Sequence, residues 1–516
     1  MSDFRLLIAV ALVLTSVPVG AAERVQPIND RRVVALALAR NPDLRAALLA
    51  LRQAEQDVVA EEERYAPVLT LDAGATHTTT PSLDREGGVT TSSSDSIVLG
   101  QQIGKTFPWG TGLSFRLEES RFSRTAQVFT GSEERVTLGP GYLMTGRLAL
   151  VQPFLRGAGT DVGEAELRAA RINRTAVEQA RDRAASDLLR GALTAYWELW
   201  YAGQAAGIER AARALANKQL EDARARLGGG AIAPVELLTF EGRVAELDEA
   251  VLVSEIAREQ RALELARLLG NPAGGSHRWV ASSESVPEPP PPPTERAAVQ
   301  QALRESPELR ELRAREDLAR DRVKSAGAAD RARLDLEAYV QADGLGNREV
   351  PPALEQFAKL GALSGHVGLI FEVPLGSDRR EAQVASAELG AEIAGEQLRS
   401  ARDRVESDVR VALLQERSAR TRLDLSDRTL RIMEKQLEAT RQRFAMGNAI
   451  PVEVLEAEED LRRARLRQTR ARVDVVLAEL SRAHLTGELL YRHRRAVAPP
   501  RRRARTGWMA AEHARF

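Results

Sequence analysis

The side chains that could perform chemistry are few in this chain and widely spaced. The six histidines stand at positions 77, 277, 366, 484, 493 and 513. None has a helical partner at metal-ligand spacing with an acid between, so the sequence predicts no zinc site. The absence of cysteine excludes disulfides, iron–sulfur clusters, thiol nucleophiles and a lipid anchor on an N-terminal cysteine.

Motifs of nucleotide binding and nucleophilic catalysis are also missing. Gly157-Ala158-Gly159 lacks the third glycine of a dinucleotide-binding loop. The sequence has neither a phosphate-binding loop nor a nucleophile elbow. We therefore expect no catalytic residue, no metal and no cofactor, and an enzyme has no supporting set of residues.

Two acidic residues, Glu453 and Glu456, are spaced so that they could act together. Three residues apart, they share one face of a helix. Carboxylates held close raise each other's pKa and attract cations. The alternative is a solvated first turn, where acidic side chains are favourable beside the helix N-terminus.

The two carboxylates lie in the second copy of an internal duplication. Residues 218–241 and 435–458 are identical at twelve of 24 positions, at a constant offset of 217. An earlier landmark around Pro42 recurs around Pro307. The copies meet at five consecutive prolines, 289–293, which predict a stiff extended linker.

The N-terminus predicts export. Arg5 is followed by a short apolar run and by the small residues Val19-Gly20-Ala21-Ala22, which is typical of a secretory signal peptide. The expected organisation is a signal peptide at 1–22, a first repeat at 23–270, a Pro-rich linker at 271–294, a second repeat at 295–490 and an Arg/Pro-rich tail at 491–516.

Each repeat has the same order of helical signals. The predicted helices are 28–64, 160–228 and 235–270 in the first repeat, and 295–327, 378–445 and 452–487 in the second. Apolar residues of the long helices recur every 3.5 residues, which is coiled-coil spacing. Aromatic residues make up only 4% of the chain, and long helices can pack on Ala and Leu alone.

Segments with strict alternation predict strands with one apolar and one polar face. Four of them, centred on 69–75, 142–150, 333–343 and 366–373, are near the ~9–11 residues that a tilted strand needs to cross a bilayer. A soluble sheet resting on a helix shows the same period, so the alternation leaves both open.

Barrel closure distinguishes these alternatives. Four strands cannot close a barrel, and hydrocarbon does not tolerate an open sheet edge. Strands that cross a membrane must therefore belong to a barrel shared by several chains. Residues 97–103 and 111–118 predict an additional hairpin, whose place in or beyond the barrel stays open. The polar stretch 84–96 is expected to be an exposed loop.

The mature chain, from about 28 to 490, resembles the TolC family of bacterial outer-membrane efflux proteins. The resemblance rests on order, duplication and a set of short motifs. These are Asn41-Pro42-Asp43-Leu44, Gln152-Pro153-Phe154-Leu155-Arg156-Gly157, Val373-Pro374-Leu375-Gly376, and the turns from Arg226 to Leu238 and from Arg443 to Leu455.

The resemblance implies a mainly α fold with a β-barrel part. Long coiled-coil helices would form an α-barrel, and four strands per chain would form a shared trimeric 12-stranded β-barrel. It also implies that the two helical turns dock a periplasmic adaptor. The residues at those positions are Arg226, Gly230, Glu236, Arg443, Gly447 and Glu453. Helix capping by Gly and Pro is the simpler explanation of the turns.

In some family members two acids narrow the mouth of the tunnel, and Glu453 and Glu456 fall at those places. Ala449 stands where an arginine would hold the mouth closed, so the closing contact of this chain is open. The expected function is an outer-membrane exit duct of a tripartite efflux or type I secretion system, working with an adaptor and an inner-membrane pump. The alternative is a periplasmic coiled-coil scaffold or adaptor without a membrane barrel.

Overall fold

The computed structural model describes residues 24–83, 89–129, 133–229, 232–271, 277–283, 285–373, 376 and 378–493. The predicted signal peptide and the tail from 494 onward lie outside the described residues. The chain divides into two compact units. Unit 1 comprises Met1–Ala46, Asp182–Pro307 and Arg404–Phe516, and unit 2 comprises Ala47–Arg181 and Glu308–Asp403.

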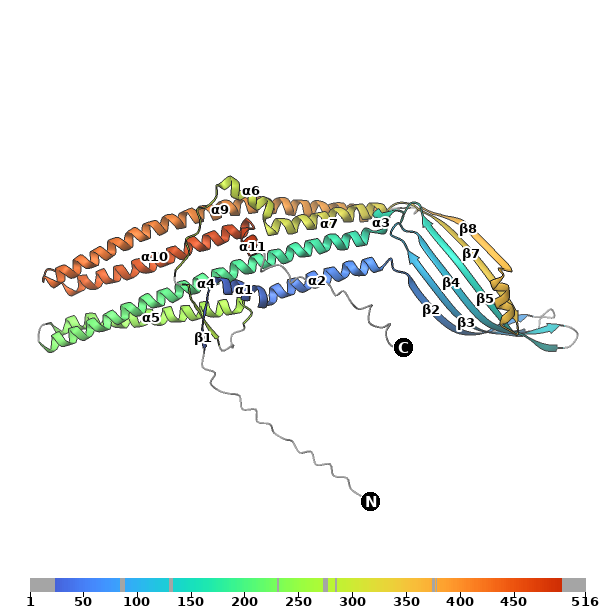
Figure 1. Cartoon of the computed structure of the whole chain (residues 1–516), viewed down its shortest axis with the longest axis horizontal. Helices are drawn as coiled ribbons and strands as arrows, with labels where there is room; N and C mark the ends of the chain where they lie inside the picture. The colour runs from blue at the N-terminus through green and yellow to red at the C-terminus, as the bar shows by residue number, and fades with distance from the viewer. Residues whose placement is uncertain are drawn as a thin grey trace, which may run out of the picture. The chain divides into compact units, whose positions relative to one another are not determined.

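The helices repeat in the order that the sequence predicts (Figure 1). The first half has α1 (Asp30–Arg40), α2 (Pro42–Glu63), α3 (Thr160–Gly163), α4 (Ala165–Gly228) and α5 (Pro234–Leu268). The second half has α6 (Glu295–Glu305), α7 (Pro307–Ala329), α8 (Pro351–Ala358), α9 (Asp378–Ala445), α10 (Pro451–Leu485) and α11 (Glu488–Arg492).

The first predicted helix of each half is in fact two helices, a correction to the ranges 28–64 and 295–327. Asn41 and Ser306 adopt extended backbone at the break. Each precedes a proline, whose ring disfavours helical geometry in the residue before it. The side chain of Asn41 accepts a hydrogen bond from the amide of Leu44 at 3.0 Å and so caps α2.

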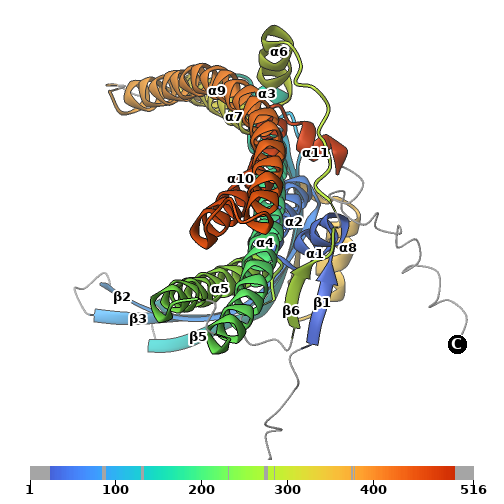
Figure 2. The same ribbon diagram turned by 90° about the vertical axis from the view of Figure 1, so that its left-hand side faces the viewer.

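Unit 1 holds a small parallel sheet and an aromatic cluster. Strands β1 (Arg24–Ile28) and β6 (His277–Ala281) pair side by side (Figure 2). Buried Tyr196 of α4 hydrogen-bonds the hydroxyl of Ser283, and the indole of Trp200 donates to the Ser283 carbonyl at 2.8 Å. The aromatic residues of α4 therefore hold the segment between the two halves.

Unit 2 contains an antiparallel sheet, which has six strands among the described residues. In spatial order they are β2 (Val68–Leu83), β3 (Val89–Thr106), β4 (Gly112–Phe129), β5 (Glu133–Pro153), β7 (Arg333–Asn347) and β8 (Ala362–Glu372). The predicted additional hairpin supplies β3 and β4. The hairpin, whose place the sequence left open, thus lies inside this sheet, between β2 and β5.

The expectation of a loop at 84–96 is wrong for residues 89–96. Polar residues from Ser92 to Ser96 pair with β2 from Thr80 to Thr76. An antiparallel pair satisfies its backbone groups whatever its side chains are, so a polar segment can be a strand when a neighbour is available. Residues 84–88 lie outside the described part of the chain.

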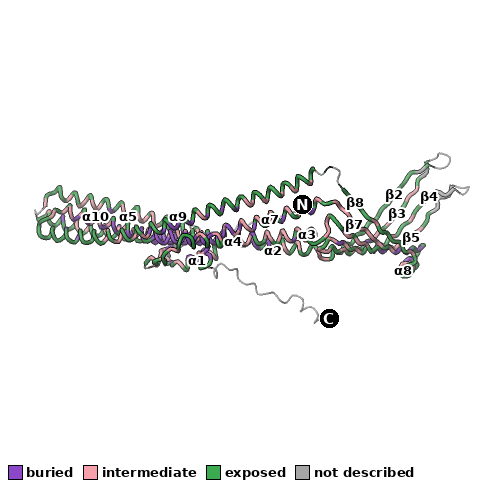
Figure 3. The backbone as a smooth tube through the Cα atoms, turned by 90° about the horizontal axis from the view of Figure 1, so that it is seen from above, coloured by how far each residue is buried: buried purple, intermediate pink, exposed green. Residues whose placement is uncertain are grey.

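The sheet has one apolar and one polar face, and most of its described residues are exposed or partly exposed (Figure 3). Helix α8 lies on the apolar face, against β7 and β5. Gly146, Gly344 and Gly346 make room for it, because a Cβ at each would clash with atoms of Phe357 or Ala353. The rest of the apolar face carries exposed Leu, Ile, Val and Phe side chains.

Candidate functional site

The turn between α9 and α10 is closed by the residues that the sequence singles out. Gly447 has φ +78°, a conformation that favours glycine. The Arg443 guanidinium donates to the Asn448 carbonyl at 3.1 Å and lies 3.2 Å from the Glu453 carboxylate. Arg443, Gly447 and Glu453 thus form one connected turn.

The two predicted mouth carboxylates differ in their surroundings. Glu453 is half-buried and paired with Arg443, and its carboxylate faces the amide of Ile450 at the start of α10. Glu456 is exposed, one helical turn further on. Both lie within the first two turns of α10, as the spacing predicts.

The turn between α4 and α5 carries Arg226 and Glu236, both exposed. Gly230 lies outside the described residues. A cavity of about 170 Å³ separates this turn from the α9–α10 turn. Arg226 and Glu236 line it on one side, and Phe444 and Pro451 on the other. The structure therefore brings the two predicted turns to one groove.

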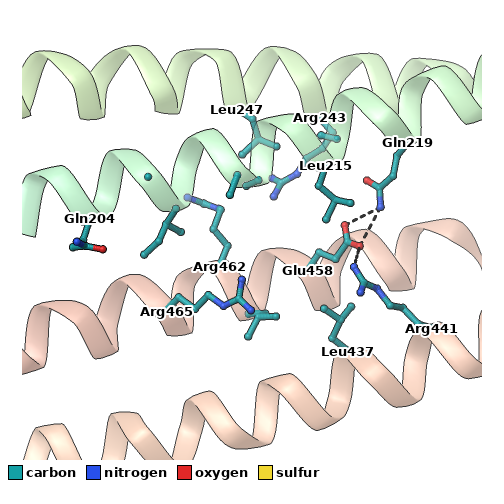
Figure 4. Close-up of a pocket in the computed structure, with 16 residues that line it drawn as sticks. Gln204, Leu215, Gln219, Arg243, Leu247, Leu437, Arg441, Glu458, Arg462 and Arg465 are labelled. Carbon is teal, nitrogen blue, oxygen red and sulfur yellow. Dashed lines mark hydrogen bonds and ion pairs between the residues drawn. The ribbon is translucent and has the colours of Figure 1, made fainter. Parts of the chain in front are cut away.

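A second cavity, of about 400 Å³, lies among α4, α5, α9 and α10 (Figure 4). Glu458 of α10 reaches across it. Its carboxylate accepts hydrogen bonds from the Gln219 amide of α4 at 3.0 Å and from the Arg441 guanidinium of α9 at 2.8 Å. One carboxylate thereby connects three helices.

An adjacent ion-pair network joins α10 to helices α4 and α5 of the first half. Arg462 donates to Glu209 of α4 at 2.5 Å, and Glu459 accepts from Arg243 of α5 and from Arg462. Burial raises the pKa of Glu459, but the hydrogen bonds from Arg462 and Arg243 outweigh it and lower that pKa to about 2. The carboxylate stays ionised at any physiological pH.

The sequence alone does not predict this network. Its only signal is local, since Glu459 and Arg462 stand three residues apart on a helix. The partners Glu209 and Arg243 are more than 200 residues away, so only the fold could identify them.

A fully buried ion pair lies nearer the C-terminal end of α10. Arg482 donates to Glu416 of α9 at 2.9 Å and to Glu488 at 3.0 Å. The side chains of Arg482 and Glu416 are 3% and 0% exposed, so neither charge is solvated by water. Such a pair is costly to break from one side, because the remaining charge stays buried.

The described residues give no sign of a metal centre or of a helical membrane anchor. They contain no group of three or more His, Cys, Asp or Glu side chains that could hold a metal ion. None of the described helices is both long enough and apolar enough to span a membrane.

Residues 298–488 match the family model described as "Outer membrane efflux protein". The match covers most of the second half of the chain. The predicted resemblance to the TolC family is thereby confirmed. No functionally curated protein matches the chain.

Solved structures extend the likeness to nearly the whole chain. The outer membrane channel CmeC of Campylobacter jejuni is 14% identical, with a TM-score of 0.64, over 91% of this chain and 89% of that one. VceC of Vibrio cholerae is 18% identical, with a TM-score of 0.59, over 89% and 96%. The open state of MtrE of Neisseria gonorrhoeae is 17% identical, with a TM-score of 0.60, over 89% of each.

At these identities the likeness shows a shared fold. The predicted fold class, long helices combined with a β part of the outer-membrane channel type, is confirmed. The family model that matches residues 298–488 describes outer membrane efflux proteins, and the solved structures of this fold are outer membrane channels. Both are those of channel proteins rather than of an enzyme family.

Proposed function

We propose that three copies of this chain form a passive exit duct across the outer membrane of a Gram-negative bacterium. The observation that carries this proposal is the match of residues 298–488 to outer membrane efflux proteins. The two-faced sheet supports it, because apolar-out and polar-in alternation is what a membrane barrel requires. The duct itself performs no chemistry, and an inner-membrane pump supplies the energy.

The groove between the two helical turns is the proposed adaptor site. Arg226 and Glu236 line this groove, which has apolar walls from Phe240 and Phe444, and Arg443 lies next to Phe444 in the sequence. The tip of a helical hairpin fits such a groove through an apolar contact and a few charged ones. Gly447 and Glu453 are proposed to shape their turn rather than to recognise the adaptor, and Gly230, which lies outside the described residues, stays a predicted docking residue.

The periplasmic mouth is proposed to be lined by Glu453 and Glu456. In a trimer each would form a ring of three carboxylates, and such rings attract cations. The pairing of Glu453 with Arg443 supports a role for Arg443 in holding the first ring. The domain limits 23–270, 271–294 and 295–490 follow the two repeats and the linker between them.

Cell fractionation tests the function against its alternative, a periplasmic scaffold. We expect the protein in the outer membrane, with heat-modifiable migration on gels and a trimeric mass by light scattering in detergent. Recovery in the soluble periplasm would exclude the duct and support the scaffold. A detergent-soluble monomer with an intact strand signal in circular dichroism would contradict the shared barrel.

A further inference from the structure

The extra strands β3 and β4 carry the same two faces as the rest of the sheet. Residues paired across an antiparallel sheet point to the same face. One row of pairs runs Leu69, Ile103, Phe115, Leu148 and Val340, from β2 to β7. These side chains are between 43% and 65% exposed, so none of the described residues covers them fully.

The next row, on the opposite face, is polar on every strand. It runs Thr70, Gln102, Arg116, Arg147, Gln341 and Ser364, from β2 to β8. At this level of the sheet the apolar band and the polar face continue across β3 and β4. At other levels the apolar face of the hairpin carries polar side chains, namely Gln101, Lys105, Glu119 and Arg121. A hairpin that projected away from the membrane would have no reason to carry an apolar band at this level of the sheet.

A specific contact on the polar face ties the hairpin into the sheet. The Arg116 guanidinium of β4 donates to both carboxylate oxygens of Asp72 on β2, each at 2.9 Å. It passes over Gly100 of β3, where a Cβ would lie 2.5 Å from Arg116 and Asp72 atoms. Glycine at position 100 therefore leaves room for this bridge.

The two edges of the sheet are suited to each other. Neighbouring strands alternate in direction, and the described sheet has an even number of them, six. The edge strands β2 and β8 consequently run in opposite directions. The β8 edge of one copy can pair with the β2 edge of the next in the antiparallel sense, which removes every open edge from hydrocarbon.

We propose that all six strands enter the membrane, so that three copies close a barrel of eighteen strands, not twelve. This inference rests on the proposed function. Barrel diameter grows roughly linearly with strand number, from about 24 Å for twelve strands to about 36 Å for eighteen, at a strand spacing of ~4.8 Å and a tilt of ~40°. Barrels of this strand number enclose an aqueous channel.

The absence of cysteine makes disulfide cross-linking a clean test, because every cross-link comes from introduced cysteines. Leu69→Cys, Leu71→Cys or Ala73→Cys is combined in turn with Val367→Cys of β8. At least one combination is expected to give a covalent trimer on oxidation. Failure of all three combinations in a native trimer would overturn the pairing of β8 with β2.

A second pair of variants asks where the hairpin lies. Ala75→Cys with Ile97→Cys joins β2 to β3, whose residues pair directly, and is expected to cross-link. Ala73→Cys with Leu143→Cys or Met144→Cys joins β2 to β5, which the hairpin separates by about 14 Å, beyond disulfide reach. A β2–β5 disulfide in a native trimer would contradict the eighteen-stranded barrel and support a barrel of twelve strands.

The barrel diameter in electron micrographs of the protein in lipid nanodiscs provides an independent reading. About 36 Å supports eighteen strands, and about 24 Å contradicts them. The proposed exit duct and the proposed strand number can be contradicted separately. Protein in the soluble periplasm would contradict the duct, whereas an outer-membrane trimer with the narrow barrel would contradict only the strand number.

Discussion

The two halves of the chain have nearly identical helices but different sheets. Helices α1 and α6 each have 11 residues, α5 and α10 each have 35, and α4 and α9 have 64 and 68. The first half nevertheless supplies four strands of the six-stranded sheet, and the second half supplies two. Packed helices must match along their whole length, whereas a sheet accepts another hairpin wherever its edges find partners.

The halves also differ in the side chains that are buried at equivalent positions of their repeated helices. At the offset of 217, Glu416 and Arg482 of the second half correspond to Leu199 and Leu265 of the first. All four side chains are almost fully buried. The second half therefore has an ion pair where the first half has two leucines. Substitutions at these positions test what this difference does to stability.

The largest expected effect comes from breaking that ion pair on one side. Glu416→Leu leaves the Arg482 guanidinium buried without its main partner and should cost about 3–5 kcal/mol in the free energy of unfolding. Changing both residues to leucine, as in the first half, should recover most of the loss. Chemical denaturation of the purified protein, followed by helical circular dichroism, measures both.

The matched control is Leu199→Ala, which removes apolar volume at the equivalent place and should cost about 2–5 kcal/mol with no rescue by Arg482→Leu. Arg482→Leu alone completes the cycle, and a loss in the double variant equal to the sum of the two single losses would show that the two charges are not coupled. The contrast between the halves would then be one of composition alone.

The next effect concerns pH. His484 of α10 corresponds to Arg267 of α5, so only the second half has a histidine at this place. Burial and the nearby charge of Arg190 lower the pKa of His484 to about 4, and its Nδ1 lies 2.9 Å from the Ser186 hydroxyl.

The sign follows from proton binding. The unfolded chain takes up a proton near pH 6.5, whereas the folded chain resists it until about pH 4. Stability is therefore full above about pH 6.5 and falls by up to about 3 kcal/mol as pH drops towards 4. His484→Gln should flatten this part of the pH profile of the thermal midpoint. The exposed control His366→Gln should not, and an unchanged profile for His484→Gln would refute the assignment.

The smallest effect on stability, and the most direct one on transport, is expected at the mouth. Glu453 and Glu456 correspond to Glu236 and Thr239 in the first half, so only the second turn carries two acids. Glu453→Ala with Glu456→Ala should change the free energy of unfolding by less than about 1 kcal/mol, because the groups are not deeply buried. It should weaken cation block and alter single-channel conductance in planar bilayers.

Glu236→Ala with Thr239→Ala is the matched variant in the first turn and should affect cation block less. Unchanged conductance and unchanged cation block in the double variant of Glu453 and Glu456 would show that these residues do not line the mouth. Equal effects of the two double variants on cation block would contradict the proposed difference between the two turns.

Much of this protein follows from local sequence. The long helix 378–445 and the start of the last helix near Pro451 are predictable because coiled-coil spacing and proline act within a few residues. The turn at Arg443, Gly447 and Glu453 is equally local. The breaks at Asn41 and Ser306 were missed, although each is followed by a proline that disfavours helix in the residue before it.

The sequence by itself determined the duplication, the helical frame and the two-faced strands, because periodicity and turn chemistry are properties of neighbouring residues. Only the tertiary structure decided the strand count, since Ser92–Ser96 becomes a strand through β2 and not through its own side chains. It alone paired Glu459 with Arg243 and Glu416 with Arg482. Such pairs join residues far apart in sequence, and which charges meet depends on how the helices pack.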